Sequence, residues 1–246
     1  MEIKIIRDII TITAFKSLPD IKRNPLMIFL ISIITSFPLF FIVVYGGELS
    51  HGITGAIVAT VGFIGLNSAI QDMAWDRYLK IRQIIVSMPV NPIAYALAIA
   101  LAPLVVSLPG LILFVSIALY LKILTLYSLL WTIVIITITW ATLSSIGFLI
   151  STYLRNASVY AISNLANILG LILVFIPPVY YPEEVLGNLS WASIMIPTSN
   201  AVGLIRAYAG ALQLPTTTLL LRWAIFIGTM IVSTLITIKK SKWRET

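Results

Sequence analysis

The side chains that carry acid–base and metal chemistry are scarce in this sequence. It has one histidine, His51, no cysteine, and nine aspartates and glutamates among 246 residues. Zinc sites take three or four His, Cys or carboxylate ligands, and neither an HExxH pattern nor a GxxxxGK[ST] loop for the phosphates of ATP is present. We therefore expect no catalytic site, no metal site and no cofactor in this chain.

The most concentrated charges between apolar segments lie from Asp72 to Arg82. An apolar stripe follows, and Pro89 and Pro92 end the helical pattern because proline lacks the amide hydrogen that a helix needs. This pattern predicts a short amphipathic helix held against a membrane surface. The alternative is an ordinary basic loop.

The amino-acid composition indicates that membrane-spanning helices position these charged residues. Hydrophobic residues make up 59% of the chain and charged residues 10%, whereas a soluble domain carries about 25% charged residues. A transmembrane helix needs about 20 mostly apolar residues. We predict an all-α integral membrane protein whose six spans cover 26–45, 53–73, 92–119, 127–151, 158–178 and 217–238. A single membrane domain, 1–246, then consists of an interface helix at 1–25, a six-span bundle at 26–238 and a basic tail at 239–246.

Lysine and arginine lie mostly on one side of these spans. Of the 16 in the chain, all but Lys122, Arg206 and Arg222 fall there. Cytoplasmic loops carry an excess of these residues, so we expect a multi-pass protein of the cytoplasmic membrane with both termini in the cytoplasm. Arg222 is close enough to the outer end of its span to extend its charge to the interface.

Residues 1–25 have the pattern of an amphipathic helix. Ile3, Ile6 and Ile10 recur at helical spacing and so share one face of a helix. Lys4 and Arg7 lie mostly off that face. We predict a helix lying in the plane of the interface. The alternative is a first helix that is solvated by its charges.

Three asparagines are the notable polar residues inside the spans. Asn67 and Asn164 each lie about six residues from the cytoplasmic end of their span, so both should be about 9 Å deep at 1.5 Å per residue. Asn167 shares the helix face of Asn164. These amides either hold helices together, at about 0.6 kcal/mol each, or line a polar path.

The stretch from Pro177 to Pro215 is long for a connection between spans, yet it is apolar and broken by Pro182 and Pro197. We expect two short half-helices that re-enter the outer leaflet, with Arg206 as one of the few charges. Irregular backbone at that depth is tolerated only where protein or a cavity covers it.

This layout resembles the type-2 permeases of the drug, polysaccharide and lipid exporter branch of the ATP-binding cassette (ABC) transporters, along essentially the whole chain. The matching patterns are Arg23-Asn24-Pro25, Asp76-Arg77 followed by Met88-Pro89-Val90-Asn91, Asn164, Tyr181-Pro182, Ile196-Pro197-Thr198 and Arg206. Asp76 stands where a glutamate is common. In that family the first cytoplasmic loop holds a coupling helix.

The resemblance implies a permease subunit that forms half of a translocation path. Its partners would be two ATPase subunits, which carry the ATP and magnesium, and a second permease in a homodimer or heterodimer. The residues expected to couple to the ATPase are Asp76, Arg77, Tyr78, Leu79, Ile81, Arg82 and Pro89. Two other functions stay open: a non-transporting membrane scaffold that docks a soluble partner, and a secondary carrier.

Overall fold

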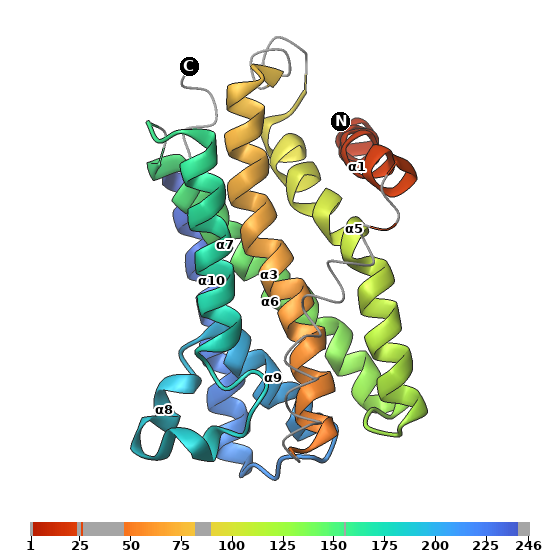
Figure 1. Ribbon diagram of the computed structural model, residues 1–246, viewed down its shortest axis with the longest axis vertical. Coiled ribbons are helices and arrows are strands. Elements are labelled where there is room, and N and C mark those ends of the chain that lie inside the picture. Colours follow the sequence, from red (N-terminus) through yellow and green to blue (C-terminus); the bar gives the residue numbers. More distant parts are fainter. Residues whose placement is uncertain (1, 24–25, 27–46, 82–89, 155, 241–246) are drawn as a thin grey trace.

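The computed structural model describes residues 2–23, 26, 47–81, 90–154 and 156–240. Within these ranges all regular elements are helical, which confirms the all-α prediction (Figure 1). The elements are α1 (Glu2–Arg23), α3 (Leu49–Tyr78), α5 (Pro92–Tyr120), α6 (Leu126–Tyr153), α7 (Val159–Phe175), the 3-10 helix η1 (Glu183–Leu189), α8 (Ser190–Ser193), α9 (Pro197–Tyr208) and α10 (Thr216–Lys240).

Four of these helices are long and apolar enough to cross a membrane: α3, α5 from Ile93, α6 and α10. They coincide with predicted spans two, three, four and six, and they give the chain the character of a multi-pass membrane protein. The fifth predicted span is shorter than expected. Its helix, α7, has 17 residues, about 25 Å at 1.5 Å per residue, because a proline pair follows at Pro177 and Pro178. The first predicted span, 26–45, lies almost wholly outside the described residues.

Helix α3 runs through the centre of the bundle and contacts α5, α6, α7 and α9 (Figure 1). It is buried along almost its whole length. Small residues make this possible, since backbones approach closely only where side chains are short. At Gly147 of α6, an added Cβ would lie 2.8 Å from the Leu66 carbonyl oxygen and 2.8 Å from the Ala69 Cβ. Contact between α3 and α6 therefore requires glycine at this position.

Local sequence signals set the helix ends. Asn91 caps α5 by accepting a hydrogen bond from the Ile93 amide at 2.9 Å, with Pro92 in the first turn. Thr125 and Ser128 form a capping box at the start of α6. Such caps satisfy amide hydrogens that have no partner within the helix.

Helix α1 lies against α5 beside the bundle (Figure 1). Its exposed apolar side includes Ile6 and Ile10, which are 57% and 62% exposed. The side chain of Ile3 lies outside the described residues. The packed side carries polar and apolar groups: Ser17 is buried, the Thr13 hydroxyl approaches the Ala98 carbonyl oxygen at 3.5 Å, and Ile12 packs against the apolar core. Ile6 and Ile10 therefore face away from the bundle, the arrangement expected of a helix that presents them to lipid.

The segment from Pro177 to Pro215 contains η1, α8 and α9. The first two are short and mostly exposed, with Leu189 and Trp191 61% and 63% exposed. Helix α9 begins at Pro197, because proline suits the first position of a helix, and Val202 and Ile205 are fully buried against the bundle. In Figure 1, α8 and α9 lie toward one end of the bundle and α1 toward the other. We call these the α9 end and the α1 end.

Candidate functional site

A buried charge pair joins α1, α3 and α5 near the α1 end. The Lys16 Nζ lies 2.8 and 2.7 Å from the two carboxylate oxygens of Asp76, and the Tyr95 hydroxyl donates to the same carboxylate. The Asp76 side chain is 5% exposed and that of Lys16 17% exposed. Three helices that are separate in sequence are therefore tied together at the last turn of α3.

This placement changes the role expected of Asp76. Its carboxylate is enclosed within the chain, whereas a contact to a soluble partner requires an exposed group. Arg77 is also engaged internally: its guanidinium donates to the Ser151 hydroxyl at 3.0 Å and to the Met73 carbonyl at 3.2 Å. Asp76 and Arg77 thus connect α3 to its neighbours.

The residues that follow form a surface at the α1 end. Tyr78 and Leu79 are 64% and 55% exposed, and the Tyr78 ring rests edge-on against Trp75 with centroids 5.8 Å apart. Ile81 is half-buried. Arg82 and Pro89 lie outside the described residues, as does the rest of the predicted coupling helix. Of the predicted docking set, Tyr78 and Leu79 are the side chains that the structure presents outward.

An amide cluster connects α3 and α7. The Asn67 amide donates to the Asn167 side-chain oxygen at 2.6 Å. Gln71, which the sequence analysis did not single out, donates to both Asn67 and Asn167, the latter at 3.3 Å. Helix rise alone predicted that these two helices present their amides at one level. Gln71 lies four residues after Asn67, the spacing that places two side chains on one helix face, and this signal could have identified it.

The cluster is buried on one side and exposed on the other. Asn67 is 7% exposed, whereas Asn164 and Asn167 lie on the exposed face of α7. The hydrogen bonds across the helices match the role of helix glue. The exposed amides match the alternative role, because polar groups at membrane depth usually face the interior of an assembly or water.

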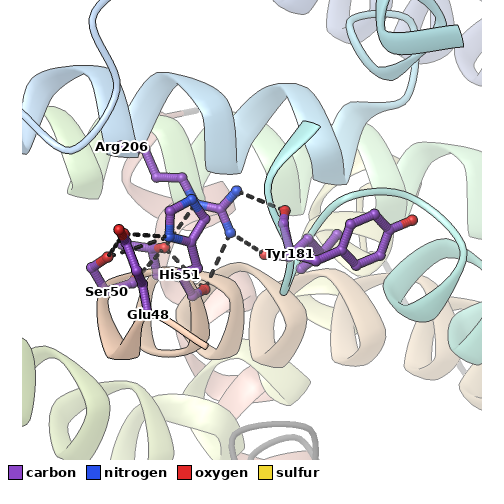
Figure 2. Close-up of polar contacts among 7 residues, drawn as sticks. Glu48, Ser50, His51, Tyr181 and Arg206 are labelled. Atoms are coloured by element: carbon purple, nitrogen blue, oxygen red, sulfur yellow. Dashed lines mark hydrogen bonds and ion pairs between the residues drawn. The ribbon is translucent and has the colours of Figure 1, made fainter. Parts of the chain in front are cut away.

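At the α9 end, Arg206 occupies the interior of the fold. It is 2% exposed, and its guanidinium donates to the Val179 carbonyl at 2.6 Å and to the His51 and Tyr181 carbonyls at 3.2 Å each (Figure 2). It also donates to the Thr54 hydroxyl at 3.2 Å. Burial lowers the pKa of Arg206 to about 10, so the side chain keeps its charge at neutral pH.

These bonds fasten the 177–182 connection and the start of α3 to α9. Charge-assisted hydrogen bonds are about twice as strong as neutral ones, and carbonyls at a helix break have no partner within the helix. Arg206 therefore supplies the donors that the irregular backbone after α7 needs. The sequence places Arg206 in this segment, but its acceptors could not be predicted, because every residue carries a backbone carbonyl.

A second arginine is buried beside the first. Arg222 is 2% exposed and lies 2.5 Å from Glu183. The prediction that Arg222 extends to the membrane interface is wrong, because its guanidinium is buried and paired with the Glu183 carboxylate of η1. Gly203 of α9 makes room: an added Cβ would lie 2.3 Å from the Arg222 Nη1.

The His51 side chain lies at the same end, beside an exposed carboxylate. Its Nδ1 lies 3.1 Å from a carboxylate oxygen of Glu48, whose side chain is 72% exposed (Figure 2). Among the described residues, no group of three or more His, Cys, Asp or Glu side chains is arranged to hold a metal ion.

Comparisons with protein-family models, with curated proteins and with solved structures found no match to this chain.

Proposed function

We propose that this chain is the transmembrane permease subunit of an ATP-binding cassette exporter in the cytoplasmic membrane, with the α1 end facing the cytoplasm. The observation that carries the proposal is the Lys16–Asp76–Tyr95 contact, which ties α1, α3 and α5 together beside the loop expected to receive the ATPase. The assignment to the ABC exporters rests on the sequence resemblance to type-2 permeases. The distribution of lysine and arginine supplies the orientation.

Coupling to the ATPase would use the exposed surface at Tyr78 and Leu79. A displacement of this surface acts directly on the last turn of α3. The ion pair between Asp76 and Lys16 would then transmit this displacement of α3 to α1. The hydrogen bond from the Tyr95 hydroxyl would transmit it to α5. Helices α1, α3 and α5 would therefore move together when the ATPase subunit moves. Such a concerted movement is required if ATP binding is to change the conformation of the helix bundle.

The translocation path would lie along the exposed amide face of α3 and α7. Asn164 and Asn167 are polar and exposed in the single chain, so the face needs a cover of protein or water when it is inside a bilayer. A second permease subunit supplies that cover and leaves the amides along the path between the two copies.

The α9 end would form the outer closure of the path. Arg206 and Arg222 are buried with internal partners there, so Arg206 holds α9 to the start of α3 and Arg222 holds η1 to α10. Their positions favour a structural role over contact with the transported compound.

The test is whether the Tyr78–Leu79 surface binds and drives an ATPase subunit. The double variant Tyr78→Ala with Leu79→Ala should lose co-purification with the partner ATPase subunit and lose substrate-stimulated ATP hydrolysis. Both side chains are exposed, so folding should be unaffected. The matched control is Tyr120→Ala with Leu121→Ala, an exposed pair, 86% and 42%, at the end of α5.

Each result separates the candidate functions. If the Tyr78 and Leu79 variant purifies with its partner and exports normally, the coupling surface is wrongly assigned. Partner binding with no ATP-dependent transport of any compound would favour the scaffold. Transport in proteoliposomes that contain this chain alone and an ion gradient would favour the secondary carrier.

A further inference from the structure

An apolar cavity of about 320 Å³ lies between the first half of α5, the second half of α6 and the last turns of α10. Small side chains on facing walls, Ala96 and Ala141 among them, leave the space open. Larger apolar residues form its rim: Ile93 and Ile238 are 65% and 66% exposed, and Leu97 is 42% exposed. The cavity therefore opens on the outer surface of the bundle.

The polar side chains of the wall are already engaged. Each of the five that the described residues contribute has an internal hydrogen bond: Trp140 to the Ala100 carbonyl at 3.0 Å, Ser144 to the Gly65 carbonyl at 3.3 Å, Ser145 with Thr234 at 3.2 Å, and Thr237 to the Ser145 carbonyl at 2.9 Å. A polar occupant would lose its bonds to water on entering and gain few in return. The wall favours a hydrocarbon.

Filling this space with hydrocarbon is favourable. The atoms that line an empty apolar groove lack the dispersion contacts that an occupant would supply. Apolar cavities of about 150 Å³ exclude water and bind benzene. This cavity is about twice that size, and its walls come from three of the four helices that are long and apolar enough to cross a membrane.

We propose that this groove binds the acyl chain of a membrane lipid. A helix of a second copy would fill the groove only with the side chains that it inserts, and it would bring the two copies within crosslinking distance. A single hydrocarbon chain is narrow enough, and the exposed rim at Ile93 and Ile238 opens toward the lipid that surrounds the bundle. This binding is independent of whether the chain is an exporter subunit.

The experiment uses the full chain in nanodiscs of phosphatidylcholine, a fraction of which carries a photoreactive diazirine in the acyl chain. After irradiation, mass spectrometry maps the labelled peptides. We expect peptides covering 141–148 and 234–238 to be labelled more strongly than the exposed α10 surface at Leu220 and Leu221, which are 64% and 52% exposed. Equal labelling of both surfaces overturns the proposal, because the groove would then be ordinary lipid contact.

Two substitutions fill the groove from opposite walls. Ala141→Phe on α6 and Ala96→Phe on α5 should each reduce labelling of 234–238 to the level of Leu220 and Leu221. The matched control, Ala161→Phe on the exposed face of α7, should leave it unchanged. Persistent labelling in both filled variants overturns the proposal, and so do crosslinks between two copies of the chain across the groove. If neither variant folds, the labelling pattern of the unsubstituted protein decides.

Discussion

The ion pair between Lys16 and Asp76 gives the most direct test of how the α1 end is held together. Lys16→Met removes the ammonium and keeps most of the side-chain volume. Asp76→Asn removes the negative charge and keeps an oxygen that can accept from the Tyr95 hydroxyl. Each single change leaves one charge without its partner inside the fold, and the double variant leaves none.

The distances between the charged atoms give the expected loss of stability for each single variant. At 2.7 to 2.8 Å between charged atoms, an effective dielectric constant of about 20 gives an attraction of about 6 kcal/mol before the cost of removing both groups from water. Breaking a buried pair by removing one partner costs about 3 to 5 kcal/mol. For a chain of this size, 1 kcal/mol shifts the midpoint of thermal unfolding by about 2 to 4 °C, so each single variant should lose on the order of 10 °C.

The assay is the fraction of monodisperse protein that remains after heating in detergent, read by size-exclusion chromatography. The control is Lys22→Met, an exposed lysine of the same helix, for which a loss below about 1 kcal/mol is expected. The double variant should be more stable than the sum of the single losses predicts, because the two residues interact directly. If Lys16→Met behaves like Lys22→Met, or if the single losses add without coupling, the pair does not hold α1 to the bundle.

Three further predictions concern the rest of the fold. Gly203→Ala should cost about 1 to 3 kcal/mol of stability through overpacking against the Arg222 guanidinium, whereas Gly228→Ala, with open space around its Cβ, should be neutral in the same heating assay. Asn67→Leu and Asn167→Leu should alter transport while stability stays near that of the unsubstituted protein if the amides line a path; loss of stability with unchanged selectivity per folded complex would instead identify helix glue. A cysteine at Glu184 should react with an impermeant thiol reagent added outside intact cells and one at Lys239 should not, and labelling of position 239 from outside would reverse the assigned orientation.

Much of the helical framework could be predicted from the sequence. Hydropathy placed spans at 53–73 and 127–151, inside α3 and α6, because a run of apolar residues is local information and the hydrocarbon core fixes the length that is required. Proline is also a local signal, and the predicted third span starts at 92, where α5 begins. The start of α9 at Pro197 was not predicted, because that proline was interpreted only as a break. The same reasoning gave α7 too long, since hydropathy does not register where a proline pair ends a helix short of the full span.

Tertiary structure alone decided which groups meet. Lys16 and Asp76 are 60 residues apart, and each taken alone resembles an ordinary charge near a membrane surface. Glu183 and Arg222 are 39 residues apart, which is why Arg222 was expected to reach the interface. The acceptors of Arg206 are mainly backbone carbonyls, which every residue has.

The groove between α5, α6 and α10 depends on the same kind of information. Ala96 and Ala141 are small residues in long apolar helices, and such residues either allow close packing or leave a space. Which of the two occurs depends on how far apart the helix axes lie at that level of the bundle. Hydropathy is a property of each residue and its neighbours in the chain, whereas the separation of two helices is set by all the side chains packed between them.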